Sequence, residues 1–427
     1  MLRHISLLTM LCACLLTSVP RVNAMGTYDK HITVEEVNSD PTLLSNKYIE
    51  KVELKGLHLK NSVITNLTLK DVNAMNGIFE NITFERCTFM KARFDDGKFI
   101  NVSFRNCSLP SLDGTEKYNM ITTFNGSTFE NVLFDNTQSQ YARFEGIRGE
   151  NGFILFKNIK SLMPDAPAPL ISISNAQVRV SDSIINGVIA GDENVHAITK
   201  NSQFTKYAGI YGDNTFIINS TLQQSSVGGR NNLIVTDSIL RGDANVGGKG
   251  YFVRNKYVPG TTKLIDGEII ILGFGLHAEP NAFIYVLAKD NEPTAFRVLG
   301  GTVTLRGFTL VNTTFGSLLK EKAPITAINL HNVTIQGGEW EGLRLLGGQW
   351  ENVKMEPPIL VDQTYIKNLR YRQLNFPKGA PWNKKGEFVL EAKESPDPFV
   401  WEEVKIPTPE DFGMVWWPEV EPGYHGK

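Results

Sequence analysis

The chain has 427 residues, and its 43 basic and 45 acidic side chains give a formal net charge of −2. This balance provides no electrostatic footprint for nucleic acid, so we expect no nucleic-acid partner. The 37 glycines and the recurring β-branched residues favour an all-β protein, and no long amphipathic helix pattern is present.

The first 24 residues have the pattern of a secretory signal peptide. Arg3 and His4 precede a largely apolar run over 5–16, and Val-Asn-Ala at 22–24 fits a cleavage site. This run is too short to cross a bilayer comfortably, and no later stretch reaches eighteen apolar residues. We therefore expect a secreted, periplasmic or cell-envelope protein that does not span the membrane. The alternatives are a lipid anchor at Cys14 and a buried N-terminal strand or helix.

Residues 25–48 precede the repeats and carry no five-residue period. Val34-Glu35-Glu36-Val37 is compatible with the start of a short helix, which Pro41 limits. Solenoid ends expose unpaired strand edges, so we expect this segment to cover the open end of the first coil.

From residue 54 onwards, every fifth residue is large and apolar, with Ala74 as the exception. The residue two places before each of them is uncharged, and the other three positions are mostly polar. A period of five fits neither a helix nor a strand and indicates a repeat architecture. The large apolar positions are Leu54, Leu59, Ile64, Leu69, Phe79, Phe84, Phe89, Phe94, Phe99, Phe104 and Leu109.

This pattern resembles that of the pentapeptide-repeat family. Ala92-Arg93-Phe94-Asp95-Asp96 is one unit, with Arg93 at the position where the family has Asp or Asn. The resemblance implies a right-handed square β-helix with four pentapeptides per coil, which we assign to residues 49–161. The period survives an interruption at 110–121, which we expect to bulge outward as a loop.

Residues twenty apart should stack in such a coil. We therefore predict one internal column made of Phe84, Phe104, Phe124 and Phe144. Cys87 and Cys107 are also twenty apart, in the small inner position, so we expect close, buried thiols that can oxidise to a disulfide after export.

Asn recurs just before the inner pair, as at Asn81, Asn101 and Asn131. Asn tolerates tight turns, so we interpret these residues as corners. Asn81 and Asn101 also match the Asn-X-Ser/Thr glycosylation acceptor, which is the alternative.

The Pro-rich stretch 162–172 is predicted to be a linker, after which the period changes. Four similar strings follow, with serines at 183, 202, 220 and 238, each preceded by Asp or Asn. The spacings are 19, 18 and 18. This resembles a right-handed parallel β-helix with one coil per repeat, in which the Asp/Asn and Ser side chains stack as ladders. We assign 173–302 to this wider central β-helix.

The five-residue period returns in 303–368, which we predict to be a second pentapeptide-repeat block. Gly338 and Gly348 occupy small inner positions beside Trp340 and Trp350. A missing side chain makes room for an indole, so we interpret both tryptophans as core residues rather than ligand platforms.

Residues 369–427 are predicted to be a Pro/Trp-rich C-terminal tail. The structural interpretation is an extended segment that packs on the solenoid and covers its end. The functional interpretation is an aromatic surface that docks sugar or protein. The candidate binding residues are Trp382, Trp401, Trp416 and Trp417.

The chain contains no nucleophile-elbow, zinc-protease or phosphate-loop motif. β-Helix hydrolases need clustered aspartates near a histidine. The Asp95-Asp96 pair is expected at a solvated corner, and a calcium-binding carboxylate ladder is a further alternative in the central part. We predict no catalytic residue, metal site or cofactor. The central candidates that are not spaced to converge are Asp192, Asp213, Asp243 and His196.

Two functions remain. The first is an exported, non-enzymatic scaffold that binds an unknown protein or glycan in the cell envelope or outside the cell, with a host surface as one setting. The alternative is a carbohydrate-active lyase or hydrolase with its site in 173–302.

Overall fold

The computed structural model describes residues 27–28, 32–112, 120–138, 142–149, 152–159, 169–191, 193–205, 208–246 and 248–257. It also describes most of 262–375, with short gaps, and 382–401, 405–414 and 421–425. The predicted signal peptide at 1–24 and both Trp416 and Trp417 lie outside the described residues.

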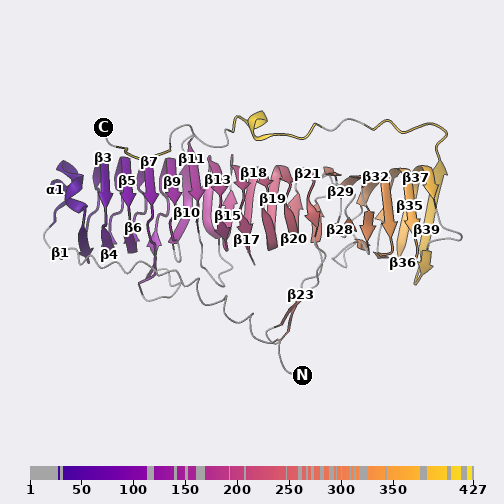
Figure 1. The fold of residues 1–427 in the computed structure, drawn as a ribbon, viewed down its shortest axis with the longest axis horizontal. Coiled ribbons are helices and arrows are strands. Elements are labelled where there is room, and N and C mark those ends of the chain that lie inside the picture. Colours follow the sequence, from indigo (N-terminus) through magenta and orange to yellow (C-terminus); the bar gives the residue numbers. More distant parts are fainter. Residues whose placement is uncertain are drawn as a thin grey trace, which may run out of the picture.

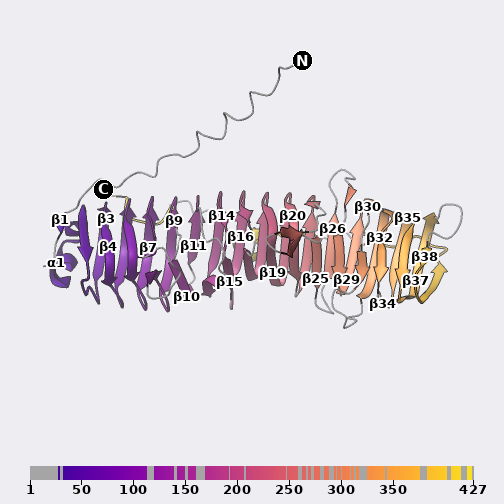
Figure 2. The same cartoon turned by 90° about the horizontal axis from the view of Figure 1, so that it is seen from below.

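The described chain winds into one elongated β-solenoid (Figure 1). Its main sheet has 37 strands, and each strand pairs in parallel with strands of the neighbouring coils. The one antiparallel pair among the described residues joins β23 (Thr262–Ile265) to β24 (Glu268–Ile270). Figure 2 shows the same stack of coils from a second side. The predicted all-β solenoid is confirmed.

The elements up to residue 157 correspond to the first predicted repeat block and its cap. They are β1 (Thr27–Tyr28), α1 (Val34–Ser39), a 3-10 helix (Pro41–Leu44), β2 (Lys47–Glu50), β3 (His58–Thr65), β4 (Thr68–Asn73), β5 (Ile78–Glu85), β6 (Thr88–Arg93), β7 (Lys98–Arg105), β8 (Thr122–Thr123), β9 (Thr128–Asp135), β10 (Ala142–Gly149) and β11 (Phe153–Lys157).

The central elements are β12 (Pro169–Ser174), β13 (Gln177–Ser181), β14 (Ile184–Ile185), β15 (Val188–Gly191), β16 (His196–Lys200), β17 (Gln203–Phe204), β18 (Gly209–Ile218), β19 (Thr221–Thr236), β20 (Ile239–Val246), β21 (Lys249–Val253), β22 (Lys256–Tyr257), β25 (Phe274–Ala278), β26 (Phe283–Leu287), β27 (Pro293–Thr294) and β28 (Phe296–Leu299).

The last elements are β29 (Gly301–Arg306), β30 (Thr309–Val311), β31 (Thr314–Gly316), β32 (Ile325–Gln336), β33 (Glu339–Glu341), β34 (Arg344–Leu345), β35 (Gly348–Glu356), β36 (Ile359–Asp362), β37 (Thr364–Asn375), β38 (Trp382–Lys384), β39 (Phe388–Glu394) and a 3-10 helix (Pro409–Phe412).

The described part of the N-terminal segment packs against the first coil. Helix α1 begins after Thr33, which forms a capping box with Glu36. Val37 in α1 and Leu44 in the following 3-10 helix are buried and belong to the same hydrophobic cluster as Leu54 of the first coil. Their burial removes the apolar end of the solenoid from water.

The first coils have four sides of five residues each. His58 of β3 pairs with Ile78 of β5, and Ile78 pairs with Lys98 of β7, so one coil takes twenty residues. The inner positions of the period, such as Phe79 and Phe84, are buried. The square coil that the repeat implied is therefore present.

The predicted phenylalanine column is wrong beyond Phe104. Lys98 pairs with Thr128, so the coil that contains the interruption at 110–121 takes thirty residues instead of twenty. A hydrogen bond from Leu112 N to Met120 O closes the interruption on itself. The residues of the interruption lie outside the coil and do not contribute to its sides. The prediction counted them as part of the twenty-residue coil, so its register fails from this point on.

Two columns replace the predicted one. Phe104 stacks on Phe84 with 5.1 Å between ring centroids and on Phe134 with 4.8 Å. Phe124 belongs to a different side and stacks on Phe94 at 5.1 Å and on Phe144 at 4.8 Å. The unbroken twenty-residue register is therefore incorrect, although the four-sided coil itself is retained.

Left-handed residues form the corners. At one corner the backbone φ lies between 46° and 60° in every coil from Asn46 to Arg254. Asn81 and Asn101 adopt φ of 53° at another corner, and each donates its side-chain amide to the Asn of the preceding coil, at 2.8 and 2.7 Å. The repeated Asn residues therefore act as corners, as interpreted. The left-handed corner residues from Asn46 onwards are Asn46, Asn66, Arg86, Asn106, Asn136, Asn158, Asp182, Asn201, Asn219, Asp237 and Arg254.

The central coils contain a buried serine ladder, which confirms the predicted stacking. Ser183 N donates to Ser202 Oγ at 3.2 Å, Ser202 N to Ser220 Oγ at 3.2 Å, and Ser220 N to Ser238 Oγ at 3.0 Å. The steps from Gln177 to His196, Asn214, Asn232 and Lys249 are 19, 18, 18 and 17 residues. Each of these coils contains fewer residues than the twenty-residue coils of the first block, so the central coils are not longer than the square ones.

The predicted boundaries at 162–172 and 369 differ from the observed ones. Strand β12 pairs with β10, with Ile171 opposite Phe144, so the solenoid has resumed within the predicted linker. At the other end, β37 pairs with β39, with Phe388 opposite Thr364, and the two strands form a further coil. The tail therefore begins after Glu394. Neither the Pro-rich stretch nor the loss of the five-residue period interrupts parallel pairing.

Trp340 and Trp350 are core residues, each 2% exposed. The Trp350 indole donates to Ile328 O at 3.0 Å. A Cβ atom at Gly348 would lie 2.4 Å from the same carbonyl oxygen, where the two backbones approach closely. Glycine at 348 is thus required by the neighbouring coil as well as by the indole.

Replacing Phe104 by Ala should lower the free energy of unfolding by about 3–5 kcal/mol, because it leaves a cavity between two stacked rings. Urea denaturation followed by fluorescence measures the change. Val400→Ala is the matched control, since Val400 is 90% exposed, and it should change stability little. Equal losses for the two variants would contradict the assigned column.

Candidate functional site

The C-terminal tail turns back and runs along one long face of the solenoid, from β39 towards the N-terminal coils, as the yellow trace in Figure 1 shows. It therefore covers a face, not the end that the sequence predicted. The described tail residues after Glu394 form no strand pairing with the solenoid. The tail is held by side chains and a few backbone hydrogen bonds.

An outward-facing column of side chains lies on this face. Alternate residues of a strand point to opposite sides, so Leu133, between the core residues Val132 and Phe134, points away from the core. Every member of the column is nevertheless buried. In register order the column is Thr83, Ser103, Leu133, Leu155, Arg179, Ile198, Phe216, Ile234 and Tyr251.

The first tail contact is centred on Trp401. Its ring stacks on His331 with centroids 4.7 Å apart, and its indole N–H donates to the Glu351 carboxylate. Glu351 is 8% exposed and also accepts from Arg372 at 3.3 Å. Arg306 lies over the indole at 6.0 Å. The Glu351 carboxylate therefore connects the tail indole to the Arg372 guanidinium on β37.

Two titratable groups in this contact have shifted pKa values. Burial raises the pKa of Glu351, but the Trp401 indole, His331 and Arg372 outweigh it and leave the pKa below its ordinary value. Burial and the Arg306 charge lower the pKa of His331 against the opposing effect of Glu351. Both shifts favour a neutral imidazole beside an ionised carboxylate.

The second tail contact is apolar. Met414 is buried in a cluster with the column residues Ile198, Phe216, Ile234 and Tyr251, separate from the solenoid core. Phe412 lies against this cluster, with its ring 5.8 Å from that of Phe216 and 6.3 Å from that of His196.

The third tail contact lies on the N-terminal coils. Glu421 forms ion pairs with Arg105 at 2.8 Å and Lys157 at 3.0 Å. Tyr424 N donates to Thr83 Oγ1 at 2.9 Å, and Gly423 N donates to Asn101 Oδ1 at 3.1 Å. Charged and backbone groups therefore fix the end of the tail.

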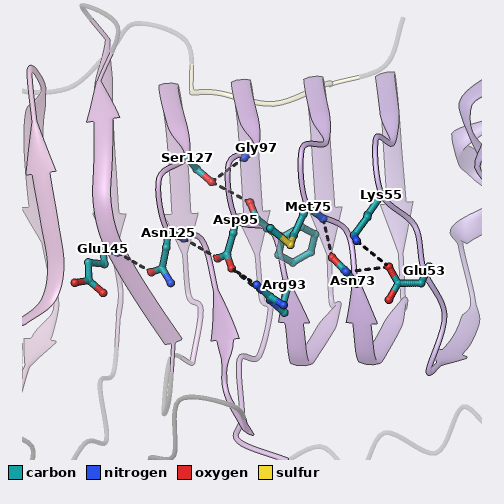
Figure 3. Close-up of polar contacts among 11 residues, drawn as sticks. Glu53, Lys55, Asn73, Met75, Arg93, Asp95, Gly97, Asn125, Ser127 and Glu145 are labelled. Atoms are coloured by element: carbon teal, nitrogen blue, oxygen red, sulfur yellow. Dashed lines mark hydrogen bonds and ion pairs between the residues drawn. The ribbon is translucent and has the colours of Figure 1, made fainter.

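The expectation of a solvated corner holds for Asp96, which is exposed with a φ of 55°, but it is wrong for Asp95. Asp95 is 5% exposed, and it accepts from the Arg93 guanidinium at 3.3 Å and from Asn125 N at 2.9 Å. Figure 3 shows it in a polar row that crosses several coils, where Glu145 N also donates to Asn125 Oδ1 at 3.1 Å. The Asp95 carboxylate accepts a hydrogen bond from a backbone N–H beside the corner, which is a structural role.

The two central candidates whose side chains the structure describes, Asp213 and His196, have different partners. Asp213 forms an ion pair with Arg230 at 3.0 Å, whereas His196 Nδ1 contacts the Asn214 amide at 2.9 Å. Asp243 pairs with Ser226 through the backbone of β20, and Asp192 lies outside the described residues. Within the described part of the chain, no group of three His, Cys, Asp or Glu residues is arranged to hold a metal ion.

The two candidate tryptophans that can be placed occupy different structures. Trp382 belongs to β38 and packs on Trp340 and Phe388, with centroids 4.9 and 5.0 Å apart. Trp401 holds the tail. Binding of a ligand by the four predicted tryptophans stays a prediction.

Cys87 and Cys107 are buried free thiols on adjacent coils, where Thr88 bridges to Ser108. Each Sγ donates to a backbone carbonyl of the preceding coil at 3.4 Å, and Thr137 occupies the same position one coil later. Burial and the neighbouring Cys87 thiol raise the pKa of Cys107. A disulfide between them stays a prediction.

The fold and this face define a parallel β-solenoid whose long outer face holds an extended segment of chain. Residues 27–109, a minor part of the chain, match the family model of the SV2A/B/C luminal domain. A comparison with curated protein sequences finds no match. Within the described residues, no helix is long and apolar enough to cross a membrane.

Three solved structures are similar at low identity. HetL, a pentapeptide repeat protein involved in heterocyst differentiation regulation from the cyanobacterium Nostoc, is 12% identical with a TM-score of 0.25 over 51% of this chain and 98% of its own. The catalytic domain of a GH87 α-1,3-glucanase is 12% identical, with a TM-score of 0.27 over 84% of this chain and 68% of its own. A mannuronic acid-specific family 6 polysaccharide lyase from human gut microbiota is 10% identical, with a TM-score of 0.20 over 84% of this chain and 91% of its own. At these TM-scores the likenesses carry no functional argument.

Acid should weaken the Trp401 contact. Both groups have a folded pKa below the ordinary value, so the detached state binds more protons and the contact loses stability as pH falls. The loss of stability from His331 begins as the pH falls towards the ordinary pKa of histidine, 6.5. The loss from Glu351 follows as the pH falls below the ordinary pKa of glutamate, 4.5. The protection factors of the backbone amides at 399–401, which correct hydrogen exchange for the intrinsic pH dependence of the amides, should fall between pH 7 and 4.

His331→Phe is the matched variant, because it keeps an aromatic ring under Trp401 but removes the titrating imidazole. Its protection factors should change less than those of the wild type between pH 7 and 5. Wild-type protection factors that rise on acidification would contradict the assigned contact.

Proposed function

We propose that this protein is an exported, non-enzymatic scaffold that binds a protein partner along its solenoid, in the cell envelope or outside the cell. The observation that carries the proposal is the tail-covered face, where apolar side chains point outward from the coils and hold an extended polypeptide. A sheet face that contacts water generally carries polar side chains, so a buried outward column such as Ile198, Phe216 and Ile234 serves contact rather than folding of the coil.

The arrangement of acids and bases supports binding over catalysis. General acid–base chemistry needs titratable groups within reach of a substrate proton. Asp95, Asp213 and Glu351 are each committed to a cationic partner, and His196 is engaged by Asn214. These four described residues therefore give no specific support for the alternative, a carbohydrate lyase or hydrolase.

Export is supported by two independent observations. The N-terminal 24 residues have the features of a signal peptide. The adjoining residues 27–109 match a domain described as luminal, and a lumen is reached by crossing a membrane.

The mature chain should begin near Met25. Intact-mass spectrometry of the exported protein measures this directly. A lipid-modified N-terminus at Cys14 would replace the soluble form by a membrane-anchored one, and a retained leader would contradict export by this signal.

The purified protein should clear no member of a polysaccharide panel under conditions in which a known lyase and a known hydrolase do. Binding without clearance would point to a glycan ligand. Clearance by the wild type that disappears in Asp213→Asn or His196→Ala, with Asp96→Asn as the unaffected control, would overturn the non-enzymatic proposal.

A further inference from the structure

We infer that the third tail contact is a recognition site for a partner protein's extended segment, one that carries an acidic residue, proline, glycine and an aromatic residue in that order. The chain's own residues Glu421, Pro422, Gly423 and Tyr424 occupy the site in the free protein. This inference rests on the proposed binding function and names where and what the scaffold binds.

The acidic residue is read by two cations from different coils. Arg105 ends β7 and Lys157 ends β11, and both contact the Glu421 carboxylate, at 2.8 and 3.0 Å. Each of the three side chains is about 70% buried, so water screens these pairs only in part. A neutral side chain in place of Glu421 would leave two cations facing each other.

The backbone after the acidic residue is read by hydroxyl and amide groups. Thr83 Oγ1 accepts from Tyr424 N at 2.9 Å and donates to Tyr424 O at 3.1 Å, which fixes both polar groups of one residue. Asn101 Oδ1 accepts from Gly423 N at 3.1 Å. Main-chain contacts of this kind give affinity for any extended segment that can reach them.

The glycine is the selective position. Gly423 is buried with a φ of 117°, and a Cβ atom there would lie 2.5 Å from both Ser103 Oγ and Thr83 Oγ1. Side chains other than hydrogen are excluded by contact as well as by backbone conformation. Pro422 beside it is also buried.

The solenoid holds the site in shape independently of its occupant. Asn101 donates its own amide to Asn81 at 2.7 Å, and Ser103 Oγ donates to Thr83 Oγ1 at 3.1 Å. Both pairs belong to coil-to-coil ladders. A preformed site loses little entropy on binding, so a segment supplied by another protein can make the same contacts.

The test uses a fluorescent peptide with the sequence of residues 418–427 and the full-length chain. In the wild type the tethered tail competes at high effective concentration, so the free peptide should bind poorly. Gly423→Ala in the chain evicts the tethered tail, and the peptide should then bind at least about 10-fold more tightly. Val400→Ala, an exposed tail position, is the matched control and should behave as the wild type.

Specificity is tested on the Gly423→Ala chain. Peptides with Gln at the position of Glu421, or Ala at that of Gly423, should lose at least about 10-fold in affinity, and so should the chain with Arg105→Ala added. Hydrogen exchange at 421–425 reports whether the tail has left. A released tail with no peptide binding would overturn the inference, and so would a tail that Gly423→Ala does not release.

One further outcome assigns the occupant differently. A wild-type dimer in light scattering that Gly423→Ala abolishes would make the occupant the tail of a second copy and overturn the partner-protein assignment. Failure of peptide binding leaves the proposed scaffold function intact, because that function is tested by export and by the polysaccharide panel. Degradation of a polysaccharide together with normal peptide binding would contradict the non-enzymatic scaffold function but leave the peptide recognition site supported.

Discussion

Every feature of this protein depends on satisfying the backbone at the coil corners. Parallel coils can stack only if the chain turns at the same place each time, and each turn leaves backbone N–H groups inside. The left-handed residues from Asn46 to Arg254 make one corner of every coil. The serine ladder from Ser183 to Ser238 supplies acceptors for the buried N–H groups beside it. Because these columns are continuous, the chain forms one solenoid rather than separate blocks.

The same constraint explains why the chemistry of the outer surface is mostly structural. Asp95 accepts from a backbone amide of the next coil, and Asn125 accepts from that of the following one. Cys107 and Thr137 both donate to carbonyls of the preceding coil, so thiol and hydroxyl perform the same task at one position. Polar side chains near the corners are therefore poor indicators of a catalytic site in this fold. The tail-covered face differs because its polar groups contact a segment from outside the coil.

The sequence was sufficient for features that repeat with a fixed spacing. The inner positions, the serine spacing and the burial of Trp340 follow from period and volume, and Pro41 limits the N-terminal helix. The step at the interruption did not, because a sequence does not show how many residues leave the coil. The buried state of Asp95 also escaped, since its partner Asn125 lies beyond that interruption. The last coil was missed because its strands do not keep the period of five.

The covered face did leave a signal in the sequence that the repeat pattern obscured. A solvent-facing strand alternates apolar and polar residues, but Val132-Leu133-Phe134 and Leu233-Ile234-Val235 are apolar throughout. Such runs are typical of strands that are buried on both sides. They indicate that something covers the outer side, whereas the identity of the covering segment requires the three-dimensional arrangement. The long-range contacts of Trp401, Met414 and Glu421 cannot be obtained from spacing alone.

The C-terminal tail lies along the outer face of the solenoid and ends at the N-terminal coils. Photo-crosslinking of the full-length protein with benzoylphenylalanine in place of Tyr424 measures this placement directly. We expect intramolecular cross-links to peptides that contain Thr83 or Ser103, because Tyr424 contacts Thr83 across a separation of 341 residues. Cross-links confined to the C-terminal coils, or none within one molecule, would contradict it.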